Sequence, residues 1–431
     1  MKTKTYVIFG ALLVTSLLSA QKPWTLQQCV DTALTNNLNV KQQALTKKNK
    51  EIAYDQARNN LLPDLSADVR EGFGFGRTLI DQYTYGNNTS SNSTSFGVSS
   101  SISLFSGFKL KYNIDARKAD LHASEADLEK IKSDITTNVA SGFLQILLNK
   151  ELLQIATDQL GLTKTKIDQR RGLVSAGKLA EGEMYDLLSQ EAKENQNRIK
   201  AENTLKLSLL DLAQFLELDH FENLDIVAPD NLSESELKLL SADEVYESAI
   251  IHRPEIKGAE FRLKSSEFNV LTSKADFYPS LTLGGQIGSD YYSTGVGSFG
   301  TQMSNRLGEN IYLSLHIPIF NKFTTRSNVR SAQLGVESSK ISVINAKLEL
   351  KKTIQQAYYN AIGAKSRWDA ALKSETASRE AYRFTNQKFE AGRATLYELY
   401  QAKSNLTQVL SEQAQAKYEY FFRIKLLELL K

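Results

Sequence analysis

The sequence predicts a mainly α-helical protein that also carries four membrane-type β-strands, arranged in two similar halves. Residues 108–172 contain no proline and few glycines, so they predict one helix roughly 95 Å long. Residues 323–389 repeat this pattern and end in a similar Ala-Gly turn. Between the helical stretches, the hydrophobic period changes from that of a helix to that of a strand. Long helical hairpins and short alternating strands therefore have to be explained together.

The start of the chain predicts an export signal. Lys2 and Lys4 precede an apolar run, and a small-residue pair before Gln21 resembles a cleavage site. The run is too short to be a comfortable transmembrane helix, and no other stretch is apolar enough for one. We therefore expect residues 1–20 to be a signal peptide and the mature chain to be exported. Cys29, the single cysteine, excludes an intrachain disulfide and lies too far from the cleavage site for lipidation.

The composition gives no sign of a catalytic or cofactor-binding protein. The formal charge of +3 over 431 residues is nearly balanced, and we expect no nucleic-acid partner. The 4 histidines lack the spacing of metal ligands. The sequence also lacks a paired nucleophile and base and a phosphate-binding glycine loop. We therefore expect no enzyme activity, no cofactor and no metal.

The two halves of the chain are related by an internal repeat. Pro63 recurs as Pro279 after 216 residues, and Gly177 recurs as Gly392 after 215. An offset held over half a chain predicts a duplication. We expect the first repeat at 21–218, an equatorial connector at 219–241 and the second repeat at 242–431.

Each long helix is expected to turn back at a tip, near 176–182 in the first repeat and 390–397 in the second. The return helices, at about 183–218 and 398–430, are shorter than the long helices. We expect the first to stack end to end with a helix at 254–277, and the second with a helix at 38–60. The termini would then meet near the middle of a helical cylinder.

Four segments alternate apolar with small polar residues, which predicts strands at 65–78, 95–105, 281–291 and 310–320. The joining segments 82–94 and 292–309 predict exposed loops. A soluble sandwich is one interpretation, but the polar faces are rich in Gly and Ser, as expected of a wet lumen. Strands of this length fit a transmembrane barrel. Because four strands cannot close a barrel and lipid tolerates no open edge, several chains must share one, with dimer and trimer both open.

The signal segment, the opening at 25–37, the Leu-Pro and Tyr-Pro strand entries, the Ala-Gly tips and the repeat together resemble the TolC-like outer-membrane efflux proteins, or outer membrane factors. The resemblance covers essentially the whole mature chain. It implies a homotrimer whose strands form a twelve-stranded transmembrane β-barrel in outer-membrane lipid and whose hairpins form a periplasmic α-helical barrel. It also implies the exit duct of a multicomponent efflux or type I secretion system. Its partners would be a periplasmic membrane-fusion adaptor protein and an inner-membrane RND, ABC or MFS-type transporter.

The resemblance further implies that acidic residues just beyond each tip line a constricted, gated entrance. Glu398 takes this role first and Glu183 second, and Tyr400 and Tyr185 follow two residues later. The alternative is that each glutamate merely starts a helix, where the helix dipole favours a negative charge.

The second tip departs from the best-known family pattern. Neutral Gln401 stands where a second acidic ring would lie, and Ala394 stands where some members have a latching arginine. Arg393 is displaced by one residue from that position, and we expect it to help close the entrance. Adaptor docking is expected at the two tip turns, formed by Ala176, Gly177, Ala391 and Gly392.

An exported structural coiled coil or adhesin without a pore is the alternative function. It would explain the long helices, but it leaves the pairs of alternating strands unexplained. A periplasmic enzyme is a third class, for which the sequence offers no site. The sequence does not reveal the cargo of such a duct, because the pump partner would select it.

Overall fold

The fold is described from a computed structural model, which covers residues 23–77, 84, 89–177, 180–218, 224–228 and 241–431. The predicted signal peptide and most of the predicted connector lie outside these described residues. The chain divides into two compact units. The tip unit comprises Met1–Asn37, Ile135–Leu239 and Asn360–Leu426, and the strand unit comprises Leu38–Asp134, Leu240–Tyr359 and Leu427–Lys431, each as far as it is described.

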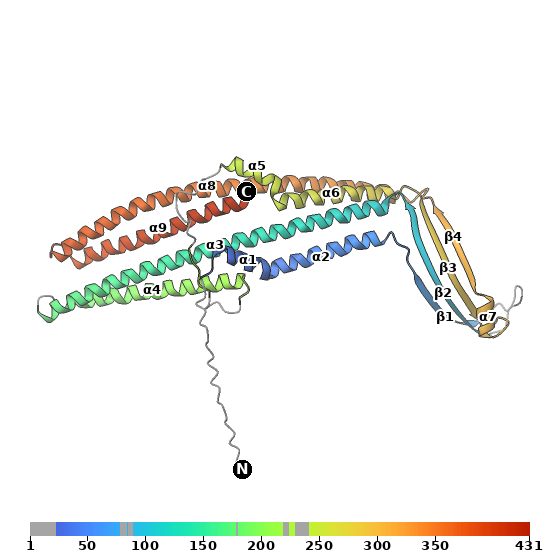
Figure 1. Ribbon diagram of the computed structural model, residues 1–431, viewed down its shortest axis with the longest axis horizontal. Helices are drawn as coiled ribbons and strands as arrows, with labels where there is room; N and C mark the ends of the chain where they lie inside the picture. The colour runs from blue at the N-terminus through green and yellow to red at the C-terminus, as the bar shows by residue number, and fades with distance from the viewer. Residues whose placement is uncertain (1–22, 78–83, 85–88, 178–179, 219–223, 229–240) are drawn as a thin grey trace, which may run out of the picture. The chain divides into compact units, whose positions relative to one another are not determined.

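The elements follow the predicted order of helices and strands (Figure 1). They are α1 (Leu26–Asn36), α2 (Leu38–Asn59), β1 (Ser66–Gly76), β2 (Thr89–Ser106), α3 (Lys109–Ser175), α4 (Glu181–Phe215), α5 (Ala242–His252), α6 (Pro254–Ala275), β3 (Ser280–Tyr292), α7 (Phe299–Asn305), β4 (Gly308–His316), α8 (Thr324–Glu390) and α9 (Leu396–Leu430).

The internal repeat is confirmed, because equivalent helices have equal lengths. α1 and α5 each contain 11 residues, and α2 and α6 each contain 22. α3 and α8 each contain 67 residues, and α4 and α9 each contain 35. None of the helices in the described part of the chain is long and apolar enough to cross a membrane.

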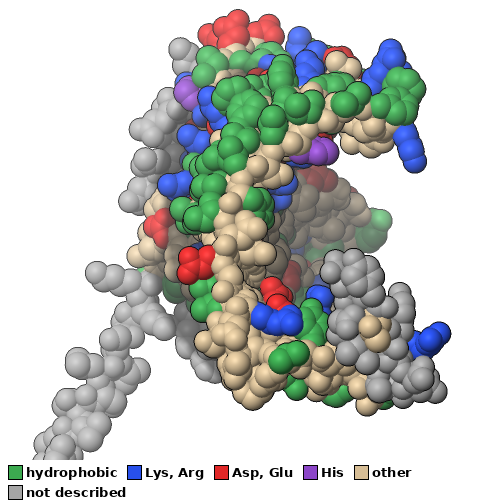
Figure 2. All heavy atoms as spheres, turned by 90° about the vertical axis from the view of Figure 1, so that its right-hand side faces the viewer, with side chains coloured by type: hydrophobic (Ala, Val, Ile, Leu, Met, Phe, Trp, Pro, Cys, Tyr) green, Lys and Arg blue, Asp and Glu red, His purple; other side chains and the backbone are tan. Residues whose placement is uncertain are grey.

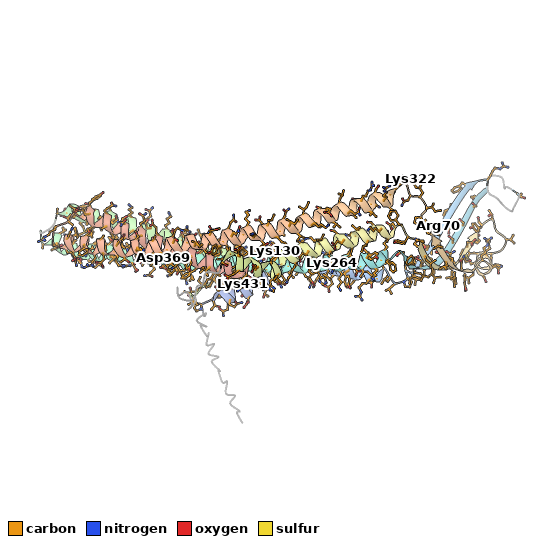
Figure 3. The ribbon with its side chains drawn as sticks, turned by 90° about the horizontal axis from the view of Figure 1, so that it is seen from above. Arg70, Lys130, Lys264, Lys322, Asp369 and Lys431 are labelled. Carbon is orange, nitrogen blue, oxygen red and sulfur yellow. The ribbon has the colours of Figure 1, made fainter. Side chains whose placement is uncertain are left out.

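The strand unit holds one antiparallel sheet in the order β1-β2-β3-β4. Its helices follow the same order as the strands they join, as Figure 1 shows for α2, α3, α6 and α8. Figure 3 gives a second view of these helices, with Lys264 labelled on α6 and Lys322 just before α8. The neighbours are tied by ion pairs: Lys47–Glu125 between α2 and α3 at 3.2 Å, Arg262–Asp127 between α6 and α3 at 3.0 Å, and Lys347–Glu260 between α8 and α6 at 3.1 Å.

The strand register gives the sheet one apolar and one polar face. Val98 lies opposite Ile287, and Leu283 lies opposite both Ile102 and Leu313, so apolar residues line up across the sheet. Figure 2 shows hydrophobic side chains gathered along one side of the curved sheet. The opposite face carries small and polar residues, among them Ser66, Arg70, Ser95, Ser99, Gln286, Asn310 and Ser314.

Two of the predicted strand boundaries and both predicted loops need correction. β4 ends at His316 rather than at 320. β2 begins at Thr89 rather than 95, because Asn, Ser and Thr residues that resemble loop residues pair with the outer part of β1. The segment 292–309 contains α7, which begins at a Ser298 N-cap. Gln302 of α7 is buried, and its amide bonds both the N–H and the C=O of Tyr292. α7 thus covers the edge of β3 beyond Gly288, where β4 has not yet begun.

The predicted stacking of the return helices is wrong. The amide of Asn37, at the α1–α2 junction, donates to the Phe215 carbonyl at the end of α4 at 3.4 Å. Arg253, at the α5–α6 junction, donates to the Leu429 carbonyl at the end of α9 at 3.1 Å and to Ser133 of α3 at 3.2 Å. Each return helix therefore ends against the short helices of its own repeat. Figure 3 labels Lys130 and Lys431, which lie in the sequence close to Ser133 and Leu429, the two partners of Arg253.

Candidate functional site: the two hairpin tips

Both hairpins turn at a glycine in the left-handed region. Gly177 has φ 67° and Gly392 has φ 70°, conformations that residues with a Cβ rarely adopt. The Gly177 N–H donates to the Val174 carbonyl at 2.9 Å, and the Gly392 N–H donates to the Phe389 carbonyl at 3.0 Å. These bonds satisfy carbonyl groups that the helix ends leave unpaired. The two predicted tips therefore have nearly the same backbone turn.

Glu398 sits in a capping box at the start of α9. The Glu398 N–H donates to the Thr395 hydroxyl at 3.2 Å, and the Glu398 carboxylate accepts the Thr395 N–H at 2.7 Å. The pKa of Glu398 is lowered, first because the Thr395 backbone N–H stabilises the charged form. Glu398 therefore has the helix-starting role that the sequence offered as an alternative, and it is also exposed and ionised.

Glu183 occupies the equivalent third position of α4, but its surroundings differ. The N-cap residue is Ala180, which has no side chain able to bond the helix N–H groups. The Glu183 carboxylate lies 3.9 Å from the Arg170 guanidinium of α3, at the long limit of an ion pair. Glu183 is thus directed toward the neighbouring helix rather than toward its own helix start.

Arg170 also connects the first hairpin to the second. Its guanidinium lies over the Phe389 ring of α8, 4.2 Å from the centroid. One turn earlier on α3, the Lys166 ammonium pairs with Glu390 at 2.7 Å. The pKa of Glu390 is lowered, chiefly by its hydrogen bond and charge interaction with Lys166. These contacts hold the end of α8 against α3, next to the tips. We call the four residues Lys166, Arg170, Phe389 and Glu390 the hairpin latch.

The other predicted site residues are spread around this latch. Tyr185 is exposed, whereas Tyr400 is half-buried and its hydroxyl has no hydrogen-bond partner among the described residues. Burial and, after it, the charge of Glu194 raise the pKa of Tyr400. Gln401 is exposed, and the tip residues Ala176 and Ala391 are exposed too.

The arginine that joins the hairpins within one copy is Arg170, not Arg393. Arg393 is exposed, and it pairs with no acidic side chain in the described part of the copy. Arg170 and Lys166 are not among the site residues predicted from the sequence. Their signal is the spacing of four residues, which places both cations on one face of α3, near the turn.

Comparison with known proteins agrees with this architecture. Residues 29–216 and 245–422 match the outer membrane efflux protein family. The chain is 25% identical over 403 residues to "Toxin and drug export protein A" of Aggregatibacter actinomycetemcomitans, covering 91% of this chain and 83% of that protein. It is 21% identical over 434 residues to "Outer membrane protein TolC" of Escherichia coli, covering 97% and 84%.

A solved membrane protein from Pseudomonas aeruginosa has the same fold. Its TM-score is 0.80 at 16% sequence identity, and the match covers 94% of this chain and 93% of that one. The family match alone spans most of both repeats. The chain therefore belongs to the outer membrane efflux protein family, and it is a protein of the outer membrane that extends into the periplasm.

Proposed function

We propose that three copies of this chain form the exit duct of a multicomponent efflux or type I secretion system. The strands of the three copies close one transmembrane β-barrel, and the helical hairpins form a tunnel in the periplasm. The duct is passive, and its gated entrance lies at the hairpin tips. The observation that carries this proposal is that the strand unit ends in two open edges that match each other.

The helix edges carry matching apolar stripes. On α2, Leu38, Leu45 and Ile52 recur every seven residues and are 63%, 55% and 65% exposed. On α8, Leu334, Ile341 and Leu348 have the same spacing and are 72%, 59% and 60% exposed. A seven-residue apolar repeat is typical of a helix surface that packs against a second helix.

Both stripes face away from the rest of the layer. Lys47, which reaches α3, lies two residues after Leu45 and so about 200° around the helix. Ser339, which hydrogen-bonds Ser266 of α6 at 2.8 Å, lies two residues before Ile341. The α2 stripe of one copy can therefore pack on the α8 stripe of the next.

The two edges of the sheet can also pair with each other across neighbouring copies. β1 and β4 are the outer strands, and an unpaired strand edge is not tolerated in lipid. Pairing β4 of one copy with β1 of the next uses the same seam as the helix stripes, and repeated contacts of this kind close into a ring. A barrel of eight strands is filled by its own side chains, whereas twelve strands leave space for a lumen. The Gly- and Ser-rich polar face therefore favours three copies over two.

The adhesin alternative is weaker, because the apolar sheet face is too exposed for a soluble protein. Val69, Phe75 and Ile311 are 79%, 85% and 84% exposed. A continuous apolar face of this kind fits contact with lipid. A periplasmic adaptor would dock on the two glycine turns, and an inner-membrane transporter of the RND, ABC or MFS type would supply the cargo. The hairpin latch would hold the entrance closed until the adaptor and the transporter have docked.

The assembly is tested by the mass of the detergent-extracted protein and by the seam variant Ile341→Glu. Native mass spectrometry should give three chains, and Ile341→Glu should give monomers. The matched control Ser342→Glu adds the same charge about 100° around α8 and should leave trimers intact. A mass of two chains, or equal assembly of both variants, would contradict the proposal.

The lipid face is tested on β4. Leu313→Arg places a charge on the apolar face, which costs roughly 2–4 kcal/mol at the centre of a membrane, so assembly in the outer membrane should be lost. Ser314→Arg places the same charge on the opposite face and should be accepted. Heat-modified gel mobility of outer-membrane fractions separates these results, and equal behaviour of the two variants would refute the face assignment.

A further inference from the structure

A layer of buried polar side chains crosses the tip unit behind the entrance. It receives residues from the helices α3, α4 and α9. Such groups are unusual in the core of a helix bundle, because burying polar atoms costs free energy unless they are hydrogen-bonded. The members of this polar layer are Gln159, Thr163, Glu194 and Lys403, which are 7%, 2%, 7% and 5% exposed.

Lys403 of α9 is the centre of the polar layer. Its ammonium donates to the Gln159 carbonyl at 2.7 Å, to the Thr163 hydroxyl and to the Glu194 carboxylate at 2.9 Å. An ammonium has three N–H donors, so all of them are used. The acceptors come from α3 and α4, so this one side chain joins the second hairpin to both helices of the first.

The polar layer is not arranged for maximum stability. One Glu194 carboxylate oxygen and the Gln159 side-chain oxygen have no hydrogen-bond partner among the described residues. Burial lowers the pKa of Lys403, since it disfavours the charged ammonium. An apolar pair of similar volume is often as stable as a buried ion pair, whereas a polar group with defined partners fixes one alignment of helices.

The packing differs on the two sides of the polar layer. Away from the tips, the core contains fully buried Phe143 and Ile146 and a cluster of Trp368 with Tyr420 and Phe421. Toward the tips, Ile167, Leu187 and Leu399 are also buried, but none of the largest fully buried side chains among the described residues lies there. A space of about 10 Å³ lies there too, between Lys403 and the latch. A region with a smaller buried core opens more readily than a well-packed one.

We propose that Lys403 is a positioning residue: the polar layer fixes the register of α9 against α3 and α4 and is the boundary where movement of the entrance stops. A slip of one helical turn, about 5.4 Å, would remove Lys403 from all of its acceptors, whereas aliphatic side chains would find new neighbours. The proposal rests on the gated entrance of the proposed function. Separation of the tips then stops at the polar layer, and the core beyond it stays packed.

The proposal is tested by spin-label distances in detergent-extracted trimers. One pair, Leu173→Cys and Phe384→Cys, reports on the tip side, and a second, Thr157→Cys and Glu412→Cys, reports beyond the polar layer. These four positions are exposed. The native Cys29 is fully buried, and burial raises its pKa to about 11, so labelling at neutral pH spares it.

Two changes are combined in this test. Arg170→Ala removes the latch contact to Phe389, and Glu194→Leu with Lys403→Met replaces the ion pair of the polar layer by apolar residues. Arg170→Ala alone should widen the tip-side distances and leave the second pair unchanged. The double variant Glu194→Leu with Lys403→Met, called the apolar variant, should shift or broaden the distance of the second pair by up to a helical turn, about 5 Å. We expect this result with or without Arg170→Ala, and without a lower melting temperature. The matched control is Glu151→Leu with Lys417→Met, a half-buried α3–α9 ion pair whose loss should change neither distance.

Unchanged distances beyond the polar layer in the apolar variant would overturn the proposal. A lower melting temperature with unchanged distances would do the same, because it would show a role in stability alone. Unchanged tip-side distances in Arg170→Ala would instead refute the latch, and the boundary with it. The register role would still be decided by the apolar variant with Arg170 in place.

Discussion

The two tips have the same backbone turn and the same glutamate, yet they use the glutamate differently. At the second tip, Thr395 caps α9, and its N–H and hydroxyl donate hydrogen bonds to the Glu398 carboxylate. At the first tip, the cap position holds Ala180, and Glu183 reaches toward Arg170. Because Arg170 also lies over Phe389, the first tip has become the one that holds the second hairpin. One residue at the cap position therefore decides whether an acidic residue starts a helix or joins two hairpins.

The tip glycines should show the largest effect and should behave alike. Valine at φ near +70° is strained by roughly 1–2 kcal/mol or more, although an added Cβ would meet no atom within 4 Å at either position. We expect Gly392→Val and Gly177→Val each to leave outer-membrane trimers intact and to stop export, if the adaptor docks on the turns as proposed. Trimer recovery and export of a reporter cargo are measured together.

Gly335→Val, near the start of α8 with open space around it, is the control for a substitution far from the tips. It should export normally. If only one of the two tip variants lost export, the adaptor would use one hairpin rather than both. Normal export by both variants would show that the adaptor does not dock on the tip turns.

Much of this comparison could be predicted from the sequence, but not the assignment of roles. The repeat, the strands and both turns follow from local patterns: proline-free runs, alternation and Ala-Gly. The capping box is local too, since Thr395 and Glu398 are three residues apart. The link between Arg170 and Phe389 joins residues far apart in the chain, so no local pattern indicates it. The prediction of how the return helices stack was wrong for the same reason. Asn37 and Arg253 hydrogen-bond helix ends that are far away in the sequence.

The latch should give the next largest effect. Arg170→Ala removes the contacts to both Glu183 and Phe389, so we expect the conductance of reconstituted trimers to rise several-fold. Cation–π contacts contribute about 0.5–2 kcal/mol, which is enough to shift a closed state appreciably when three copies act together. Arg393→Ala, at the second tip, should raise the conductance less. A larger effect of Arg393→Ala would assign the closing role to the second tip, as the sequence alone suggested.

The cap positions allow the two tips to be exchanged. Thr395→Ala should weaken the start of α9 by about 1 kcal/mol, because helix N–H groups lose an acceptor. Ala180→Thr should create a capping box at α4 and strengthen its first turn by a similar amount. It should also withdraw Glu183 from Arg170 and raise conductance slightly. Amide hydrogen exchange at residues 181–184 and 396–399 measures the helix starts, and unchanged protection in both variants would contradict the comparison.

The smallest effect is expected at Glu398 itself. Its pKa is lowered, so the group stabilises the folded state at pH values above the usual pKa of a glutamate, and this contribution is lost as the pH falls through the lowered pKa. At neutral pH the three copies of Glu398 would therefore form a charged ring. Glu398→Gln can still close the capping box, since glutamine also serves at this position, so the helix should survive while the charge is removed. We expect a modest fall in cation preference and weaker block by divalent and trivalent cations in reconstituted trimers. Glu183→Gln should change both less, because Arg170 already offsets that charge at 3.9 Å. The reverse ranking would place the narrowest point of the entrance at the first tip, and no change in either variant would leave Glu398 as a helix-starting residue.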